Sequence, residues 1–416
     1  MLFDPESVEH VFRSEEVMPI RPGIESLMYY RQRHNKTYDP TRLTGLGSDQ
    51  GENWREFRSK VNPIMMQPKT IKLYTDVLED VANDMIKRLR SVRDEKDTIS
   101  KKFNVEMNLW ALESISVVAL GTRLNCFDPN LPADSPVRRL IRNVNDIFEI
   151  AMKLDFAPSA WRFFATPLFK KAMKTYEEHE SLTKYFIDRA IKRLEESKKC
   201  SEETPNSEKP VLEKLLDIDV RIAHIMASDM LLAGVDTASN TAIATLYLLA
   251  VNQEKQRKLR VEILSKQARK PYLKACIKES MRMLPVVNGN MRLATKDYNL
   301  LGYKIPKNVM VLFSHQYMSN MEENYPKPDE FIPERWLTSK DDPLYHGNTH
   351  RFAMAPFGFG IRMCIGRRIA ELEMETLISK VVENFQIDWM SDEPIQITPI
   401  LFNYVTAPFH FHFKDL

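Results

Sequence analysis

The sequence predicts a mainly α-helical protein with a smaller β portion, an α+β fold, and three observations lead to this prediction. Apolar residues recur at helical spacing through long stretches of the chain before Pro285. After Arg292 the pattern changes to short alternating segments separated by turns, such as the hairpin-like stretch DYNLLGYKIPKNVMVLF. The alternating FHFHF at 409–413 predicts a further strand near the C-terminus.

The periodicity also predicts the helices in chain order. They are expected at 8–15, 54–62, 70–92, 105–121, 144–153, 173–197, 220–252, 272–284 and 367–385. A further helix is expected to follow residue 252 and to end near 269. The helix at 272–284 should end where Pro285 removes a backbone donor. Residues 16–51 are expected to form a loop, and the polar stretch 198–209 a mobile linker.

Composition limits the classes of function. The chain has 416 residues, 43% of them hydrophobic, which is enough for a large core and by length alone for two or three domains. Basic residues number 59 and acidic residues 57, so no global charge favours nucleic acid. The four cysteines form no CxxC pair and suit neither a zinc site nor a disulfide framework, which favours a reducing compartment. No apolar run is long enough to span a membrane, and the first residues resemble neither a secretory signal nor a transit peptide.

The sequence around Cys364 gives the strongest indication of function. It lies in the stretch FGFGIRMCIG at 357–366, where three glycines predict a tight loop that can approach a flat, bulky group. The helix expected at 367–385 follows directly, and its dipole and free N–H groups favour a thiolate over a thiol. Such a cysteine suits an axial ligand of haem iron, because a thiolate ligand favours cleavage of the O–O bond. The alternative is an inert, buried cysteine in a glycine-rich turn.

This loop resembles, at every fixed position, the haem-binding signature of the cytochrome P-450 family, Phe-x-x-Gly-x-Arg-x-Cys-x-Gly. The resemblance covers nearly the whole chain. It implies a cytochrome P-450 fold with residues 1–416 as one haem domain, and haem b between the long central helix and the cysteine loop. By the same resemblance Cys364 is the axial iron ligand, and Phe357, Gly358 and Gly366 contact the cofactor.

The expected long central helix contains AGVDT at 233–237. A glycine inside a helix costs about 1 kcal/mol relative to alanine, and Thr237 can bond a carbonyl one turn back, so a local widening of the helix is expected. From the residues alone, the alternative is a packing glycine with an Asp–Thr pair on the surface. The stretch resembles the family's oxygen-activation motif, which implies that Asp236 is the acid and Thr237 the alcohol of a proton relay. The resemblance also makes Ala233 and residues 286–290 candidates to line the substrate pocket.

Glu279 and Arg282 are three residues apart and therefore share one face of their expected helix. An exposed pair of this kind contributes little to stability. The resemblance implies instead that Arg335, in the stretch FIPERW, joins them in a buried charge triad that is structural and not catalytic.

Trp54 and Arg58 are four residues apart, again on one helix face. Haem carries two propionates, which need cationic and preferably bidentate partners. The resemblance assigns Trp54, Arg58, Arg292 and Arg362 to these propionates. Each of them alone would more often be a solvated surface arginine or a core tryptophan.

Four cations are candidates for docking of an electron donor. Lys274 and Lys278 are four apart on one expected helix, and Arg367 and Arg368 lie in the first turn after the cysteine loop, where positive charge opposes the helix dipole. On charge alone they could equally form a merely solvated basic face.

The stretches YLKACIKESMR and GIRMCIGRR resemble the mitochondrial branch of the family. Overall the chain is most similar to insect mitochondrial members of the family's twelfth group, which are associated with xenobiotic and hormone metabolism. This resemblance implies electrons from an acidic ferredoxin served by NADPH-ferredoxin reductase, and a place on the matrix side of the inner mitochondrial membrane. Family members usually begin upstream of Met1 with a targeting segment, a first helix and the first strands of a sheet, which this chain is expected to lack.

The segment FAPSAWRFFATPLF at 156–169 is strongly aromatic and lies between two expected helices. Core packing would account for it. The alternative is a lip that dips into a membrane surface near a substrate entrance, which would be a peripheral membrane contact.

Together these features predict a haem-thiolate monooxygenase that inserts one atom of dioxygen into an apolar small molecule of the steroid-hormone or xenobiotic class. Two alternatives stay open. One is a truncated, non-catalytic haem binder or inactive fragment, which the expected lack of upstream elements favours. The other is a haem-thiolate isomerase that needs no external electrons, against which the Asp236–Thr237 pair argues.

Overall fold

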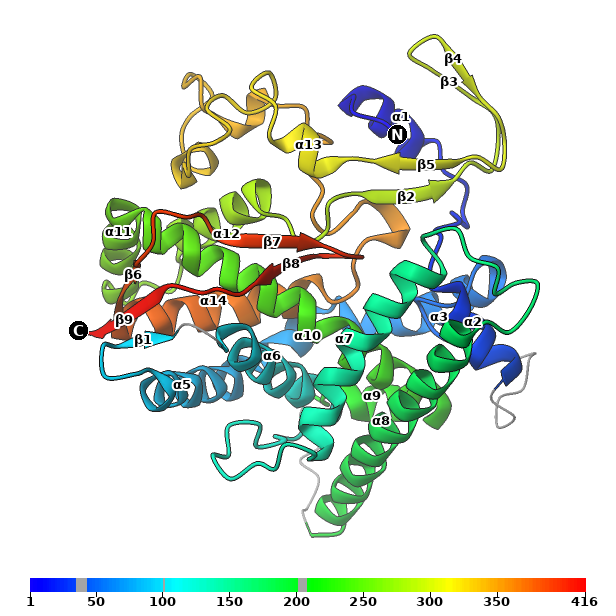
Figure 1. Ribbon diagram of the computed structural model, residues 1–416, viewed down its shortest axis with the longest axis horizontal. Helices are drawn as coiled ribbons and strands as arrows, with labels where there is room; N and C mark the ends of the chain where they lie inside the picture. Colours follow the sequence, from blue (N-terminus) through cyan, green and yellow to red (C-terminus); the bar gives the residue numbers. More distant parts are fainter. Residues whose placement is uncertain (35–42, 100–101, 201–207) are drawn as a thin grey trace. The chain divides into compact units, whose positions relative to one another are not determined.

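The computed structural model describes residues 1–34, 43–99, 102–200 and 208–416, and Figure 1 shows the course of the chain. The chain forms two compact units. The first comprises Met1–Arg21, Ala82–Met107 and Thr237–Leu416, and the second comprises Pro22–Val81 and Asn108–Asp236. The helices α5 (Thr75–Val92), α6 (Phe103–Leu120) and α10 (Val220–Val251) contain residues of both. That residues 1–416 act as a single haem domain stays a prediction.

The second unit is built of helices in the part that the structure describes. They are α2 (Glu25–Tyr29), a π-helical turn (Tyr30–His34), α3 (Gly51–Met65), α4 (Pro68–Lys72), α7 (Pro136–Leu154), α8 (Pro167–Cys200) and α9 (Val211–Leu216), together with its share of α5, α6 and α10. Helix α6 is apolar around its circumference and most of its side chains are buried, as expected for a helix enclosed by others.

The first unit combines helices with small antiparallel sheets. Its other helices are α1 (Pro5–Arg13), α11 (Gln253–Leu264), α12 (Pro271–Met283), α13 (His315–Ser319) and α14 (Arg367–Asn384). Its strands are β1 (Thr98–Ile99), β2 (Asn290–Leu293), β3 (Tyr298–Leu300), β4 (Tyr303–Ile305), β5 (Met310–Phe313), β6 (Phe385–Trp389), β7 (Gln396–Pro399), β8 (Asn403–Thr406) and β9 (Phe411–Asp415). β9 lies between β1 and β6, while β2 pairs with β5, β3 with β4 and β7 with β8. The predicted α+β fold class is confirmed.

The N-terminal segment is tied to the sheet of β2 and β5 (Figure 1). Leu2 forms a parallel bridge with Phe313 of β5, and Ile20 forms an antiparallel bridge with Leu293 of β2. Helix α1 lies between these two bridges in the chain. The segment that follows α1 is therefore held next to Arg292, which neighbours Leu293 on β2.

Several predicted elements differ from those in the structure. The expected helix 70–92 is divided into α4 and α5 by a turn at Leu73 and Tyr74, and the Tyr74 hydroxyl accepts a hydrogen bond from the Val211 N–H at 2.8 Å. The expected loop 16–51 contains α2 and the π-helical turn. The expected linker 198–209 begins inside α8, and its residues 201–207 lie outside the described residues.

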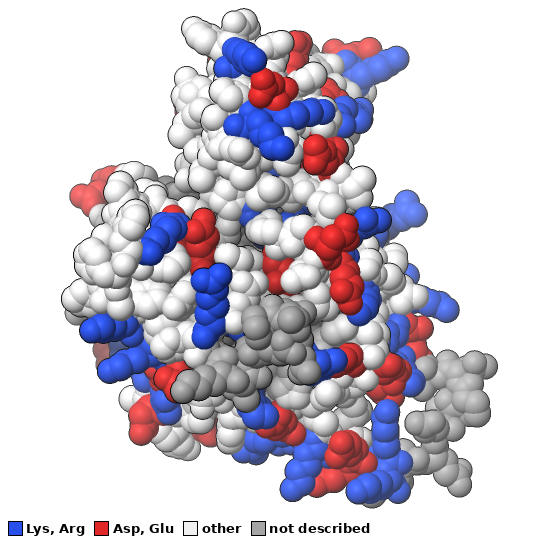
Figure 2. Space-filling model, turned by 90° about the vertical axis from the view of Figure 1, so that its right-hand side faces the viewer, with Lys and Arg blue, Asp and Glu red and all other residues white. Residues whose placement is uncertain are grey.

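The length and hydropathy of the helices and the distribution of surface charge test two predictions made from the composition. Among the described residues, no helix is both long enough and apolar enough to cross a membrane. Acidic and basic side chains are interspersed on the face that Figure 2 shows, and neither sign dominates it. This agrees with the balanced composition of the chain.

Candidate functional site

The stretch around Cys364 folds as a partly exposed loop of the first unit. The Cys364 N–H donates a hydrogen bond to the Phe357 carbonyl at 2.8 Å, which closes the loop. Gly358 and Gly360 have φ angles of 69° and 70°, in the left-handed region that residues with a Cβ rarely adopt. Gly358 and Gly360 are thus required by the turns that present the cysteine.

Cys364 differs from the other cysteines whose side chains the structure describes. The thiols of Cys126 and Cys276 are buried, and burial raises the pKa of each well above its ordinary value. The Cys364 side chain is exposed, and α14 begins three residues later at Arg367, with Gly366 as its cap residue. The alternative of a buried, inert Cys364 is therefore wrong.

Two of the arginines that the resemblance assigns to propionates lie in the same unit, and both are buried. The Nε of Arg362 donates a hydrogen bond to the Pro19 carbonyl at 3.0 Å. The Nη1 of Arg292 donates to the Met291 carbonyl at 2.9 Å, and its Nε lies 2.5 Å from Oε1 of Glu15. The segment after α1 thus contacts both arginines.

Arg21 and Glu15 belong to the same group of charges, and neither was expected from the sequence. Burial lowers the pKa of Arg21, the positive charge of Arg292 lowers it further, and Cys364 acts in the opposite direction. Burial raises the pKa of Glu15, while Arg292 and Arg362 oppose that rise. An arginine before proline and a pair of glutamates after a helix are ordinary loop residues, so no local signal marks them.

These residues fit a haem. The exposed thiol is of the kind that would supply a ligand for iron, and the buried arginines would supply countercharges for two propionates. Arg292 Nε and Glu15 Oε1 are close but not aligned as a hydrogen bond, so both atoms are buried without a hydrogen-bond partner. A Cβ at Gly366 would lie 3.9 Å from the Cys364 sulfur, an ordinary contact distance, so Gly366 directly adjoins the thiol. The roles of Phe357, Gly358 and Gly366 toward the cofactor stay predictions.

Trp54 and Arg58 lie one turn apart on α3 of the second unit. Trp54 is 2% exposed and therefore part of the core, while Arg58 is half-buried. Their assignment to the propionates stays a prediction.

Helix α10 carries Gly234 at a close approach to α6. A Cβ on Gly234 would lie 2.7 Å from Cγ1 of Ile115, so no larger residue fits without displacing that side chain. The helix is α-helical from Val220 to Val251 without interruption. The predicted local widening is therefore wrong, and the glycine serves close helix–helix packing instead.

The acid and alcohol of the predicted relay lie side by side on α10. Asp236 is 1% exposed, which excludes the alternative of a surface Asp–Thr pair. With its amide nitrogen turned toward Asp236, Asn145 of α7 donates to both carboxylate oxygens, at 2.9 and 3.0 Å. Thr237 is half-buried, and Ala233, one turn earlier, is exposed although most residues of α10 are buried. Asn145 is a partner that the sequence did not indicate, because it lies in another helix.

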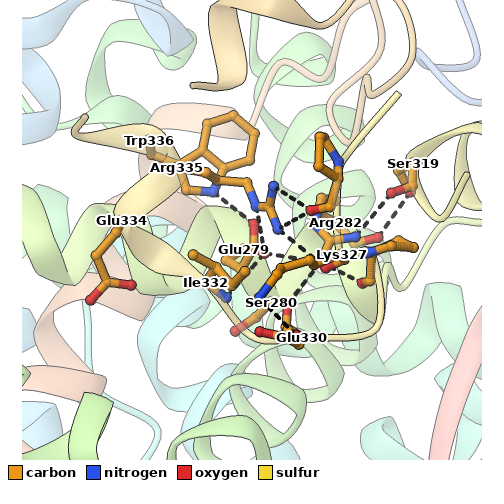
Figure 3. Close-up of polar contacts among 12 residues, drawn as sticks. Glu279, Ser280, Arg282, Ser319, Lys327, Glu330, Ile332, Glu334, Arg335 and Trp336 are labelled. Atoms are coloured by element: carbon orange, nitrogen blue, oxygen red, sulfur yellow. Dashed lines mark hydrogen bonds and ion pairs between the residues drawn. The ribbon is translucent and has the colours of Figure 1, made fainter. Parts of the chain in front are cut away.

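The residues of the expected charge triad are in contact, and all three side chains are completely buried (Figure 3). Oε1 of Glu279 accepts hydrogen bonds from Nη2 of Arg282 and Nε of Arg335, each at 2.9 Å. Oε2 accepts a hydrogen bond from Nε1 of Trp336 at 2.9 Å. Nη1 of Arg282 donates to the Ser319 carbonyl at 3.0 Å, and Nη2 donates also to the Pro328 carbonyl at 2.7 Å. Among the described residues, the buried Nε of Arg282 has no hydrogen-bond partner. The triad thus ties α12 to the irregular segment that precedes the cysteine loop.

The four cations expected to dock an electron donor lie on α12 and in the first turns of α14. Lys274 pairs with Glu375 at 3.3 Å, and Lys278 lies over the Trp336 ring, 5.6 Å from its centroid. The remaining two cations are Arg367, which pairs with Glu371 at 2.9 Å, and Arg368, which is exposed. Contacts within the molecule thus orient three of these side chains.

The aromatic segment 156–169 is divided between the interior and the surface, and its predicted membrane contact stays a prediction. Trp161 stacks on Phe169 with ring centroids 5.2 Å apart, and Tyr29 packs edge-on against both rings. Phe163 and Phe164 are 88% and 63% exposed. One part of the segment is therefore core, and the other presents apolar rings to the surroundings.

Comparison with known proteins places the chain in a family. The cytochrome P450 family model matches residues 1–412. Cytochrome P450 CYP12A2 of Musca domestica is 39% identical over all of this chain and 81% of its own length. Probable cytochrome P450 12a5, mitochondrial, of Drosophila melanogaster is 38% identical over the same shares. Cytochrome P450 12b1, mitochondrial, of Drosophila acanthoptera is 37% identical over 95% of this chain and 76% of its own.

Solved structures agree on the fold. A cytochrome P450 named CYP102L1 superimposes with a TM-score of 0.78 at 17% identity, covering all of this chain and 88% of that one. A cytochrome P450DA haem domain gives the same TM-score at 18% identity over 99% of this chain. The chain belongs to the cytochrome P450 family and is similar to its insect CYP12 mitochondrial members. It is a monooxygenase, and the cofactor of this family is haem.

Proposed function

We propose that this cytochrome P450 oxidises an apolar small molecule of the steroid-hormone or xenobiotic class, with electrons from a ferredoxin. The observation that carries the proposal is the exposed Cys364 thiol on its glycine loop, immediately before the N-terminus of α14. When bound, a haem with a thiolate ligand supplies activation of dioxygen and cleavage of its O–O bond. The protein supplies the ligand, the binding of the cofactor, a proton path and a pocket.

The protein groups of the cofactor site have distinct tasks in this proposal. The dipole and free N–H groups of α14 stabilise the Cys364 thiolate. Arg292 and Arg362, with Trp54 and Arg58 of the second unit, would hold the two propionates and so fix the orientation of the haem. The buried triad would keep the segment before the loop rigid, because a ligand must be held within a narrow range of positions.

Asp236 and Thr237 are proposed as the proton path. The buried Asp236 carboxylate is held by Asn145 and can pass a proton toward the Thr237 hydroxyl, its neighbour on α10. We expect Asp236→Asn and Thr237→Ala to divert electrons into hydrogen peroxide, measured as peroxide formed per NADPH consumed. Thr241→Ala is the matched control, because among the described residues its hydroxyl bonds only the Thr237 carbonyl one turn back, at 2.8 Å. Equal peroxide yields in the Thr237 and Thr241 variants would reject the relay.

The pocket for an apolar substrate is proposed beside Ala233. This residue is exposed on a helix that is otherwise mostly buried, so open space adjoins α10 there. We expect steroids or apolar xenobiotics to shift the Soret band of the loaded protein, and Ala233→Phe to weaken that shift by filling the space. A full response in the Ala233→Phe variant would place the substrate elsewhere.

Ferredoxin, itself reduced by NADPH-ferredoxin reductase, is proposed to dock on the face of Lys274, Lys278 and the first turn of α14. We expect the double variant Lys274→Glu/Lys278→Glu to slow reduction by ferredoxin while leaving reduction by dithionite unchanged. Lys340→Glu, a reversal at another exposed site, is the control. Unchanged reduction by ferredoxin in the double variant would reject this docking face.

A mitochondrial location on the matrix side of the inner membrane is proposed from the relatives, two of which are named mitochondrial. The exposed Phe163 and Phe164 rings would give a peripheral contact with that membrane. Replacing both by serine should weaken binding to vesicles of mitochondrial lipid composition. Unchanged vesicle binding would leave the two rings without this role.

The proposal as a whole is tested by loading the purified chain with haem, reducing it and adding carbon monoxide. We expect the Soret shift that is typical of a thiolate ligand, and its loss in Cys364→Ala. Haem uptake without ferredoxin-supported turnover would favour a non-catalytic haem binder. Conversion of a substrate without any electron donor would favour an isomerase.

A further inference from the structure

We propose that Glu15 is a positioning residue for the haem, one that holds the Arg292 guanidinium so that its remaining edge is presented to a propionate. The inference rests on the proposed haem-thiolate function. It assigns a task to the segment after α1, which neither the signature motif nor the propionate assignment includes.

The contacts of Arg292 show how its guanidinium is held. Its Nε lies 2.5 Å from Glu15 Oε1, and its Nη1 donates to the Met291 carbonyl at 2.9 Å. Its planar group lies over the Phe12 ring, 5.0 Å from the centroid. Two edges and one face are therefore engaged, while in the part of the chain that the structure describes no residue bonds Nη2.

Glu15 is itself held between two functional segments. It directly follows α1, and Phe12 of that helix packs against Phe359 of the cysteine loop with ring centroids 5.8 Å apart. A Cβ on Gly360 would lie 3.9 Å from Glu15 Oε2, so this carboxylate also borders the loop. The Ile20 bridge to β2 anchors the segment at its other end. Glu15 thus links the strand that carries Arg292 to the loop that carries the iron ligand.

A carboxylate next to Arg292 need not displace a propionate. A guanidinium has five N–H donors in a rigid fork, so different edges can serve two carboxylates at once. Arg21, Arg292 and Arg362 place three positive charges near the cysteine loop, and the carboxylate of Glu15 opposes them with one negative charge. Removing the Glu15 carboxylate should make the surroundings of the iron more positive and favour its reduced form.

The test compares Glu15→Gln with Glu16→Gln. Both variants remove one negative charge from adjacent positions, but the Glu16 side chain is exposed. We expect Glu15→Gln to lose haem to excess apomyoglobin roughly tenfold faster than the wild type, equivalent to about 1.4 kcal/mol. Its midpoint potential, measured by spectroelectrochemistry, should be higher. Glu16→Gln should match the wild type in both measurements, and equal behaviour of the two variants overturns the proposal.

A second arm asks whether Glu15 acts through Arg292. In an Arg292→Gln background, Glu15→Gln should add little to the rate of haem loss, and a full additional effect overturns the proposal. Where Glu15→Gln does not give a cooperative melt, Glu15→Asp replaces it. The shorter side chain breaks the 2.5 Å contact but keeps the charge, so haem loss should again be faster, and a wild-type rate rejects the role.

Failure of this inference can be told from failure of the proposed function. A wild-type chain that takes up haem without the thiolate-type Soret shift rejects the haem-thiolate site, and with it the role of Glu15. A wild-type chain with that shift, combined with identical Glu15→Gln and Glu16→Gln variants, rejects the role of Glu15 alone.

Discussion

The buried charge triad and the surroundings of the cysteine loop both contain a glutamate next to arginine. The two glutamates differ in how completely they are hydrogen-bonded. Glu279, Arg282 and Arg335 are fully buried, and both oxygens of Glu279 accept well-aligned hydrogen bonds. Near the loop, Arg292 is also buried and the Glu15 side chain is 10% exposed; Arg292 Nε and Glu15 Oε1 lie 2.5 Å apart but are not aligned as a hydrogen bond. Both oxygens of Glu279 therefore have hydrogen-bond donors, whereas Oε1 of Glu15 has none among the described residues.

This difference separates a cluster with a structural role from one that is proposed to bind the cofactor. Buried polar groups in a native protein are almost always satisfied, and the Glu15–Arg292 pair borders the cysteine loop, which agrees with the proposed binding of a propionate beside it. The triad, through the bonded carboxylate of Glu279, instead stabilises the segment that precedes the loop. Substitutions in the triad should therefore mainly lower stability, whereas substitutions near the cysteine loop should mainly affect haem binding.

Glu279→Gln should have the most severe effect on stability. It leaves two buried arginines without a counter-charge, and removing one partner of a buried ion pair typically costs ~3–5 kcal/mol. Urea unfolding should show a lower midpoint and poor accumulation of folded protein. Glu330→Gln is the control, because Glu330 pairs with Lys327 at 3.3 Å on the surface and should matter by less than about 0.5 kcal/mol. Similar midpoints for both variants would show that the triad is not a structural support.

Gly358→Ala should disturb the loop more than its backbone conformation alone requires. A left-handed conformation costs a residue with a Cβ roughly 1–2 kcal/mol, and here the new Cβ would also lie 3.2 Å from Oδ1 of Asn290. Gly121→Ala is the matched control, with a φ of 64° and no atom within 4 Å of the new Cβ. We expect a larger fall in melting temperature, and a lower haem content, for the Gly358 variant. An equal fall would mean that the contact with Asn290 adds nothing.

Glu334, which directly precedes Arg335 of the triad, should make the free energy of unfolding depend on pH. Burial acts to raise its pKa, but hydrogen bonds from Lys258, its own backbone, Tyr272 and Lys255 outweigh burial and lower the pKa to about 2, from an ordinary value of 4.5. A lowered carboxylate pKa contributes stability above the ordinary value, and that stability is lost as the pH falls toward the folded pKa. The urea midpoints of wild type and Glu334→Gln should therefore differ at pH 7 and converge on acidification below about 4.5. A difference that stays constant down to about pH 3 would contradict this.

Cys364→Ala should have almost no effect on the stability of the haem-free protein. The thiol is exposed, and surface substitutions usually change stability by less than about 0.5 kcal/mol. The variant should nevertheless lose the thiolate-type Soret shift completely. Cys276→Ala should show the reverse, a destabilisation of roughly 1 kcal/mol from the buried site with the Soret shift retained. A marked loss of stability in haem-free Cys364→Ala would indicate a packing role for this thiol.

Much of the fold could be predicted because a packed helix has apolar residues at regular spacing in its own sequence. The periodicity of apolar residues located most helices, including α6, α10, α12 and α14. It could not locate the division between α4 and α5, because Tyr74 is fixed there by Val211, which is far away in the chain. The strands β6, β7 and β8 were missed for a related reason, since short strands acquire their pattern from the partners they pair with.

The same limit applies to the site. The residue order of the chain was sufficient to propose roles for Cys364, Asp236 and Thr237, because each belongs to a motif of contiguous residues. Spacing also indicated that Glu279 could pair with Arg282, and the family resemblance added Arg335. The residue order did not indicate Glu15 for Arg292, Asn145 for Asp236 or the contact of Gly234 with Ile115. Those contacts join residues that are far apart in the chain, and their energies arise only when packing removes water and brings the groups within bonding distance.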